Sequence, residues 1–249
     1  MLKYKYRVCS KKNTRAEDKP NEDMAALNED LGVGMVLDGV SRDRENGAYP
    51  KPSPAKIASQ VFADAVLEEA RTCGKAGLDK IKSMIYNGNA EVRKYNQQLK
   101  HQFPAGTVGI VFSIENAEFH YGYIGDCYAA IIREGMMRTF TECQTAMVSK
   151  HKKEFTADEI RFAICNHISH PCGYGVWDGN SSAMDFVKYG TIRIADGDTI
   201  LAYTDGMKEI IDKMELRDLA KKSLSEFEDM KPSAGLDDRT CIRITIKNG

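Results

Sequence analysis

The stretch that decides the fold is residues 106–133, GTVGIVFSIENAEFHYGYIGDCYAAIIR. It contains three runs rich in β-branched and aromatic residues, at 106–114, 118–124 and 128–133, and such residues favour strands. Asn116-Ala117 lies between the first two runs, where a two-residue loop suits a hairpin. Strands joined by such short turns run antiparallel. The middle of the chain therefore predicts an antiparallel sheet.

Apolar runs on either side of this centre predict further strands. They lie at 31–37, 190–194, 199–204 and 240–246, and each is long enough for a strand. Asp196-Gly197 separates the second run from the third, so we expect these two to pair as a hairpin. In the last run Ile242, Ile244 and Ile246 alternate with polar residues, which predicts that one face of this strand is buried.

Helical periodicity appears in two regions between these strands. Apolar residues recur at helical spacing over 57–73 and again over 78–99. We expect the second helix to break at Asn87-Gly88-Asn89, because Gly and Asn favour turns. Helices bunched between hairpin-connected strands favour an α+β fold over a parallel βαβ sheet.

Two more helices are predicted in the second half of the chain. Thr156 and Glu159 have the spacing of a capping box, which predicts a short helix that ends near residue 165. Residues 209–227 alternate acidic and basic side chains, which is typical of a helix with a solvated face.

The overall charge balance excludes some classes of protein. The 249 residues include 35 Lys+Arg and 36 Asp+Glu, a formal net charge of −1. No bulk positive charge attracts the chain to nucleic acid, so we expect no nucleic-acid partner. The hydrophobic share of 42% and the charged share of 29% are typical of a globular domain, and the length suits one domain.

Several features predict a cytoplasmic location. Seven cysteines without a C-x-x-C pair indicate reduced thiols instead of a disulfide framework. The basic residues 1–7 lead into no apolar segment, so we expect no signal peptide. The longest apolar run, 105–114, is about half the length of a membrane span, so we expect no membrane partner.

Acidic residues lie at the ends of the predicted core strands. Asp38-Gly39 follows one apolar strand and Asp205-Gly206 follows another, whereas most Asp-Gly pairs are simple turns. Glu22-Asp23 precedes the first of these strands, and Asp237-Asp238 precedes the last strand of the chain. If these acids converge, their mutual repulsion is tolerable only when cations lie between them.

Six motifs in order resemble the metal-dependent protein phosphatase family, the 2C-type serine/threonine phosphatases. They are N-E-D (21–23), the apolar strand with D-G (38–39), G-T (106–107), G-D-C (125–127), G-D-T-I-L-A-Y-T-D-G (197–206) and D-D-R-T (237–240). The match runs from about residue 13 to 246. The resemblance implies an α-β-β-α sandwich with two central antiparallel sheets flanked by helices. It also implies that 1–249 is a single phosphatase domain with a variable flap around 142–190.

The resemblance further implies a site for two Mn²⁺ or Mg²⁺ ions. Asp38 would bridge both metals, and Gly39 would contribute its backbone carbonyl. Asp205 and Asp237 would hold the first metal, while Glu22 would support the second directly or through water.

Three more acidic positions complete the roles that the resemblance implies. Asp126 stands in the family's G-D-S motif and would help to form a third, weaker metal site. Asp23 would orient a water, so that Asp38, Asp205 and Asp23 are the predicted catalytic residues. Asp238 stands where the family often has Asn, so Asp237 is the predicted ligand.

The chemistry of these residues agrees with a phosphatase. Carboxylate oxygens suit the hard cations Mg²⁺ and Mn²⁺ better than Zn²⁺. Two such ions can activate water and hold phosphate oxygens, so that no nucleophilic side chain is needed. The predicted reaction is hydrolysis of phosphoserine or phosphothreonine in a phosphoprotein, acting against a serine/threonine kinase.

The chain departs from the family where the phosphate is gripped. Members usually have an Arg four residues before the Glu, where this chain has Asp18; Lys19, Arg15 and Arg42 are the candidate replacements. Some members have a His directly after Asp-Gly that protonates the leaving group, and Val40 cannot do so. The alternatives are a weak or inactive pseudophosphatase that acts as a binding module, and a small-molecule phosphoesterase.

A second group of metal-binding residue types lies in the predicted flap. Cys165, His167, His170 and Cys172 fall within eight positions, and zinc uses such ligands. Structural zinc sites usually pair ligands from two elements, so we interpret this segment as a loop with incidental thiols. For Trp177, a packing role competes with a place in a substrate groove.

Overall fold

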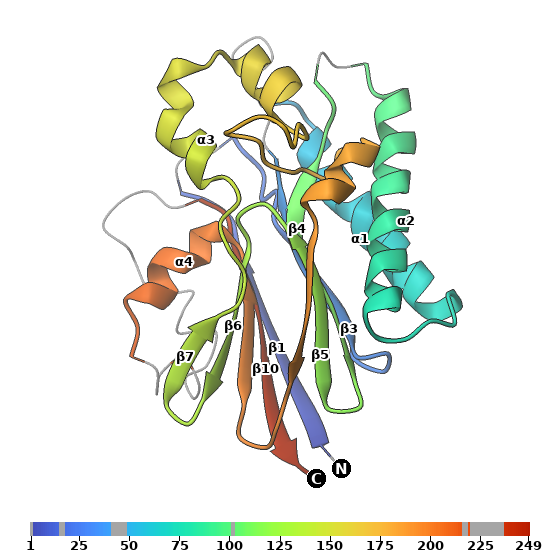
Figure 1. The fold of residues 1–249 in the computed structure, drawn as a ribbon, viewed down its shortest axis with the longest axis vertical. Helices are drawn as coiled ribbons and strands as arrows, with labels where there is room; N and C mark the ends of the chain where they lie inside the picture. Colours follow the sequence, from blue (N-terminus) through green and yellow to red (C-terminus); the bar gives the residue numbers. More distant parts are fainter. Residues whose placement is uncertain (1, 15–17, 41–48, 101–102, 216–218, 220–236) are drawn as a thin grey trace.

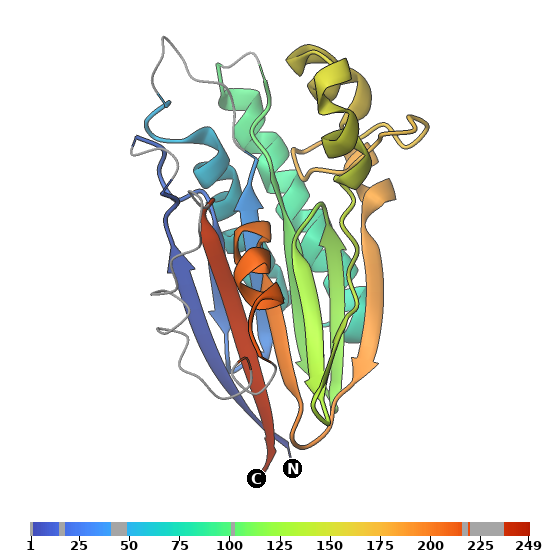
Figure 2. The same cartoon turned by 90° about the vertical axis from the view of Figure 1, so that its left-hand side faces the viewer.

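Two five-stranded antiparallel sheets lie face to face in the computed structural model, which describes residues 2–14, 18–40, 49–100, 103–215, 219 and 237–249 (Figure 1, Figure 2). The first sheet has the order β1 (Leu2–Lys11), β10 (Arg239–Asn248), β9 (Thr199–Tyr203), β6 (Tyr128–Arg133), β7 (Met136–Thr139). The second has the order β2 (Met24–Asn28), β3 (Val33–Gly39), β4 (Thr107–Glu115), β5 (Glu118–Ile124), β8 (Lys188–Arg193).

Helices flank the two sheets. The helices α1 (Pro54–Thr72) and α2 (Gly77–Gln98) pack together and contact β3, β4 and β5, while α4 (Asp205–Asp212) contacts β10 (Figure 1). The α-β-β-α sandwich that the sequence predicts is confirmed. Between β7 and β8 the chain forms four short helices, α3 (Ala146–His151), η1 (Lys152–Glu154), η2 (Glu159–Ile164) and η3 (Ser181–Phe186).

Alternate side chains of β10 pack into two different hydrophobic clusters, one on each face of the first sheet. Ile242, Ile244 and Ile246 belong to the main core between the sheets. Cys241 faces the other way and packs in a separate cluster with Met207 and other residues of α4. Successive side chains of a strand point to opposite faces, so one strand serves two cores and the predicted buried face is confirmed.

Helix α2 is continuous through Asn87-Gly88-Asn89, so the predicted break is wrong. A Cβ atom at Gly88 would lie 2.7 Å from Cε2 of Phe62 in α1, which means that the glycine lets the two helices approach closely. Asn89 is buried and bonds across to the 178–180 loop, donating to the carbonyl of Asn180 at 3.0 Å. These turn-forming residues therefore serve helix packing.

The predicted hairpin between 190–194 and 199–204 is also wrong. β8 pairs with β5 in the second sheet, whereas β9 lies between β10 and β6 in the first. Gly197, with a φ of 86°, helps the chain turn from one sheet to the other. Arg133 fixes this crossing by donating bonds of 2.8 and 2.6 Å to the two carboxylate oxygens of Asp198.

Other sequence predictions have mixed outcomes. Thr156 and Glu159 form the reciprocal bonds of a capping box, with Thr156 N donating to Glu159 Oε2 at 2.7 Å. The sequence predicts a charged helix over 209–227. The helix α4 begins earlier, at Asp205, and ends at Asp212. Of the predicted range, residues 216–218 and 220–227 lie outside the described residues. In the described part of the chain, no helix is both long and apolar enough to span a bilayer.

Candidate metal centre

Acidic residues meet at the end of the sandwich that lies away from both termini. β3 and β9 finish there, while β2 and β10 begin there, because each pair runs antiparallel. The turns and strand ends at this place carry the predicted acids: Glu22, Asp23, Asp38, Asp126, Asp205, Asp237 and Asp238. The topology therefore brings together residues that are more than 200 positions apart in the sequence.

Asp38, the next-to-last residue of β3, lies at the centre of this group. Burial raises the pKa of its carboxyl well above the ordinary value, although part of its surface stays accessible. The nearby charges that raise this pKa further are, in order, those of Asp23, Asp205, Asp126 and Asp237. An acid held toward its neutral form by burial and like charges is typical of a functional site.

Asp23 is held by one oxygen and leaves the other without a partner. Thr204 Oγ1 donates a 2.7 Å hydrogen bond to Asp23 Oδ2. Asp23 Oδ1 is buried and has no hydrogen-bond partner among the described residues. Burial raises the pKa of Asp23, and the charges of Asp238 and Asp205 raise it further, while hydrogen bonds from Thr204 and Thr240 oppose the increase. A buried oxygen without a partner is uncommon, and it leaves Asp23 Oδ1 with an unused acceptor position.

Glu22 is fixed by the beginning of α1. Ser53, the N-cap of that helix, donates from its hydroxyl to Glu22 Oε1 and accepts from Lys56 N at 3.3 Å. The Glu22 side chain is only 1% exposed. At Gly39 a Cβ atom would lie 2.8 Å from the backbone oxygen of Glu22, so the glycine permits the close approach of these two segments.

The two acids before β10 have different environments. Asp238 is 3% exposed and accepts bonds from the backbone N of Asn13 at 2.7 Å and of Glu22 at 2.9 Å. Asp237 is 36% exposed, and its Oδ1 accepts from the backbone N of Asp238 at 2.9 Å. Asp238 thus ties three chain segments together, whereas the predicted ligand Asp237 is more accessible.

Lys19 lies among these carboxylates. Its Nζ is 3.1 Å from Asp237 Oδ1, 3.6 Å from Glu22 Oε2 and 3.6 Å from Asp238 Oδ2. Burial lowers the pKa of Lys19, but the charges of Asp237 and Asp238 outweigh burial and leave it raised. The other two candidates for gripping phosphate, Arg15 and Arg42, lie outside the described residues.

Asp126 lies in the turn between β5 and β6, next to the segment that was predicted to be a flap. Thr145 Oγ1 donates to Asp126 Oδ2 at 2.8 Å, and burial raises the pKa of this acid. A cavity of about 200 Å³ adjoins it. The residues that line this cavity are Asp126, Thr145, Val148, Ser149, Lys152, Ile160 and Tyr174.

Known proteins resemble this chain in sequence and in fold. No family model matches the chain. It is 24% identical over 203 residues to the putative protein phosphatase 2C 24 of Oryza sativa subsp. japonica, covering 79% of this chain and 53% of the relative. The chain therefore spans about half the length of this curated relative.

Solved structures match over the whole chain. The serine/threonine phosphatase PstP/Ppp of Mycobacterium tuberculosis is 17% identical, with 100% of both chains covered and a TM-score of 0.67. The PPM Ser-Thr phosphatase MsPP of Mycobacterium smegmatis is 15% identical, with 98% of both chains covered and a TM-score of 0.66. This chain has the PPM phosphatase fold. The resemblance that the sequence motifs indicated is thereby confirmed.

The donors at this end of the PPM fold fit Mn²⁺ or Mg²⁺. They are carboxylate and carbonyl oxygens, which hard cations prefer, and the orphaned Asp23 Oδ1 belongs to a further acid close to Asp38. A structure of the PstP catalytic domain, 17% identical over 100% of both chains with a TM-score of 0.66, holds two manganese ions. Within the described residues, however, no group of three or more His, Cys, Asp or Glu side chains is arranged to hold a metal as it stands.

Several supporting residues in this PPM fold were not singled out from the sequence. Thr107 Oγ1 donates to the backbone carbonyl of Asp38 at 2.9 Å, and Ser59 Oγ donates to Thr107 Oγ1 at 3.0 Å. Thr204 and Ser53 act similarly on Asp23 and Glu22. Thr107 and Thr204 do stand inside the quoted motifs, which was the available signal. Ser53 and Ser59 carry no such signal, because only α1 brings them to the site.

The Cys and His residues of the predicted flap do not form one cluster. Cys165 packs in the main core, whereas Cys172 packs in a small cluster with Val148 and Ile164. Trp177 is 0% exposed, and its ring stacks on Phe62 at 4.4 Å between centroids, so its role is packing.

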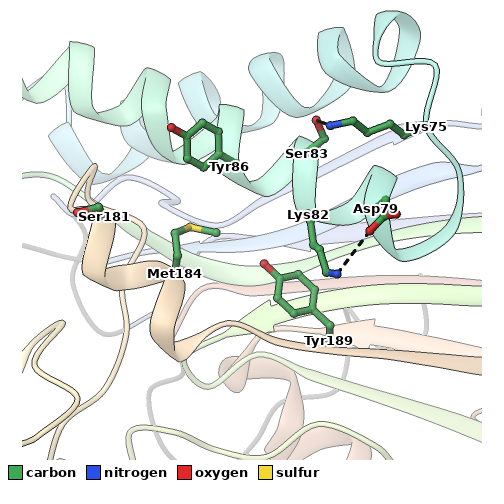
Figure 3. A pocket seen from close by; sticks show the side chains of 8 residues that line it. All are labelled: Lys75, Asp79, Lys82, Ser83, Tyr86, Ser181, Met184 and Tyr189. Atoms are coloured by element: carbon green, nitrogen blue, oxygen red, sulfur yellow. Dashed lines mark hydrogen bonds and ion pairs between the residues drawn. The ribbon is translucent and has the colours of Figure 1, made fainter.

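A larger cavity, of about 840 Å³, lies between α2 and the segment formed by η3 and β8 (Figure 3). Its lining residues include Lys75, Tyr86, Met184 and Tyr189. None of the predicted site residues lines it. The cavity is therefore separate from the acidic cluster.

Proposed function

We propose that this chain is a metal-dependent phosphatase that hydrolyses phosphoserine or phosphothreonine in proteins. The observation that carries the proposal is the electrostatic environment of Asp38, whose pKa is raised by burial and by the acids around it. Such a cluster is costly unless cations neutralise it. The PPM fold and the similarity to a protein phosphatase 2C support the reaction class.

The residues that would hold two Mn²⁺ or Mg²⁺ ions are the predicted ligands at the end of the sandwich where β3 and β9 finish. They are Asp38, the carbonyl of Gly39, Asp205, Asp237 and Glu22, with Asp126 for a third, weaker site. When bound, such ions supply Lewis-acid activation of water and neutralise phosphate charge.

Asp23 would act on the attacking water through its unpartnered oxygen. Because Thr204 holds Asp23 Oδ2 at 2.7 Å, Oδ1 keeps a fixed direction. A water that donates a hydrogen bond to Oδ1 would be oriented for attack on phosphorus. Asp23 is in this proposal a catalytic residue because it would touch the reacting water.

The size of the cavity beside Asp126 favours a protein substrate over a small molecule. Its volume of about 200 Å³ is below the roughly 300–1,000 Å³ of typical small-molecule pockets. It is large enough for a side chain next to a phosphorylated residue. Lys152 at its edge would favour an acidic or phosphorylated neighbour.

We place the whole chain in one domain and propose that 142–190 is a flap over the site. This segment carries Thr145, which bonds Asp126, and most of the residues that line the smaller cavity. The partner would be a phosphoprotein whose kinase this enzyme opposes. Seven free cysteines support a reducing compartment such as the cytoplasm.

The test is hydrolysis of p-nitrophenyl phosphate and of a phosphothreonine peptide with Mn²⁺, with Mg²⁺ and with EDTA. Asp38→Asn and Asp205→Asn should abolish metal-dependent turnover. Asp64→Asn is the matched control, because Asp64 is exposed on α1, where it accepts a 2.9 Å hydrogen bond from Gln60. If the wild type shows no turnover above Asp38→Asn but still binds Mn²⁺, the chain is a binding module instead.

A further inference from the structure

Lys19 is the cation that the described structure places inside the acidic cluster. Its side chain is 14% exposed and contacts carboxylates from two distant segments, Glu22 before β2 and Asp237-Asp238 before β10. Lysine is rarely buried to this extent unless it is paired with acids. An exposed ion pair contributes little to stability, but a partly buried one with several partners has a larger electrostatic effect.

The oxygens that Lys19 contacts belong to residues that the proposed function assigns to metals. Ser53 holds Glu22 Oε1, whereas Lys19 lies 3.6 Å from the other oxygen, Oε2. At Asp237 it lies 3.1 Å from Oδ1. The ammonium group is therefore positioned to neutralise the Glu22 and Asp237 carboxylates that a divalent ion would also need.

We propose that Lys19 is a built-in counter-ion that competes with the divalent metal for Glu22 and Asp237 and, once displaced, binds the phosphate group. This inference rests on the proposed function, since it assumes that the acids bind metal. Lys19 would pair with the carboxylates when the site is free of metal and with the phosphate when the site holds metal.

The physical reason is the repulsion between like charges. An ammonium 3–4 Å from oxygens that coordinate a divalent ion would lie close to that ion, and this repulsion is strong where water is partly excluded. Lys19 has a flexible four-carbon stem, so it can turn to another anion without moving the backbone. A phosphate bound at the metals is the nearest new anion that the proposed reaction supplies.

The proposal predicts coupling between metal and phosphate. If metal binding releases Lys19 for phosphate, then phosphate must strengthen metal binding by the same factor. A purely structural ion pair would favour neither the empty nor the loaded site and would give no contribution to this coupling.

Isothermal titration of the metal-free protein with Mn²⁺, with and without inorganic phosphate, measures both effects without turnover. Lys19→Met should bind Mn²⁺ about tenfold more tightly than the wild type in the absence of phosphate, because the competing cation is gone. Phosphate should strengthen Mn²⁺ binding severalfold in the wild type and less in Lys19→Met. Lys19→Arg should keep most of the coupling.

Lys94→Met is the matched control, because it removes a lysine that pairs with one acid, Glu91, on the exposed face of α2. It should bind Mn²⁺ as the wild type does. Thermal unfolding gives an independent measurement: Mn²⁺ should raise the melting temperature of Lys19→Met more than that of the wild type. This comparison stays informative if the metal-free variant is less stable.

Unchanged or weaker Mn²⁺ binding by Lys19→Met would overturn the competition, and full phosphate coupling in that variant would overturn the second role of Lys19. Either result can occur while the wild type hydrolyses phosphopeptides, in which case the proposed function stands. If neither protein binds Mn²⁺ and neither has activity, both proposals fail.

Discussion

Two acidic residues of the second sheet, Glu115 and Asp38, have pKa values that are shifted in opposite directions. Glu115, at the end of β4, accepts bonds from Gly77 N at 3.0 Å, Lys80 Nζ at 3.0 Å and Ser113 Oγ at 2.9 Å. Burial works to raise the pKa of Glu115, but these donors outweigh it and lower the pKa. At Asp38, burial and like charges act together and raise the pKa.

The difference distinguishes an acid whose charge stabilises the fold from one whose charge destabilises it. Glu115 accepts from a backbone N–H, an ammonium group and a hydroxyl, so its negative charge stabilises the folded state. Asp38 has other acids as its neighbours, so its charge costs stability until a cation arrives. Natural proteins keep such unfavourable clusters where function requires them.

The strongest test of this contrast is Asp38→Asn. We expect catalytic activity to fall by about three orders of magnitude or more, because the central carboxylate is lost. The metal-free variant should nevertheless be more stable than the wild type by roughly 1–3 kcal/mol, since one of several repelling charges is gone. Turnover assays and urea denaturation in EDTA measure the two effects, and a less stable variant would break the contrast.

Metal addition should stabilise the wild type strongly. At a free Mn²⁺ concentration of about 100 times the dissociation constant, binding adds about 2.7 kcal/mol to the free energy of unfolding. EDTA should reverse the gain, which differential scanning calorimetry can follow. In Asp38→Asn the gain should be small, whereas in Glu115→Gln it should equal that of the wild type. If Mn²⁺ stabilised Asp38→Asn as much as the wild type, Asp38 would not be a metal ligand.

The metal-free protein should lose stability as the pH rises. Folding raises the pKa of Asp23 from 3.8 to about 8, so the folded state binds a proton more tightly than the unfolded state does. The stabilising effect is complete below pH 3.8 and is lost as the pH rises toward about 8. Between pH 6 and 8 we expect a loss of roughly 2–3 kcal/mol. Urea denaturation in EDTA at several pH values measures it, and a curve that rises over this range would contradict the prediction.

Of the four predictions in which stability is measured, Glu115→Gln should show the smallest effect. We expect a loss of about 1–2 kcal/mol in the free energy of unfolding, because Lys80 keeps a partly buried charge without its partner. Activity per folded molecule should not change, since Glu115 lies at the other end of β4 from the site. Urea denaturation and turnover measured on the same preparation would show both results. If Glu115→Gln were more stable than the wild type, the charge of Glu115 would destabilise the fold, as that of Asp38 is expected to do.

Local patterns predicted seven of the strands but missed β1, β2 and β7, and they predicted only part of the strand pairing. The hairpin between β4 and β5 follows directly from Asn116-Ala117, both of which have positive φ angles. The pairing of β8 with β5 instead of β9 does not follow, because a turn motif such as Asp196-Gly197 does not specify which sheet each strand enters. In the same way, Gly88 looks like a helix breaker until Phe62 is packed against it.

The sequence by itself determined the fold class and supplied the acids of the proposed site, because strand periodicity and six ordered motifs can be recognised without coordinates. Only the tertiary structure decided how each acid is used. Asp238 takes backbone donors, Asp23 keeps an oxygen without a partner, and Lys19 lies between Glu22 and Asp237. These differences come from long-range contacts, and the pKa of a carboxyl depends on what surrounds it in space and not on its neighbours in the chain.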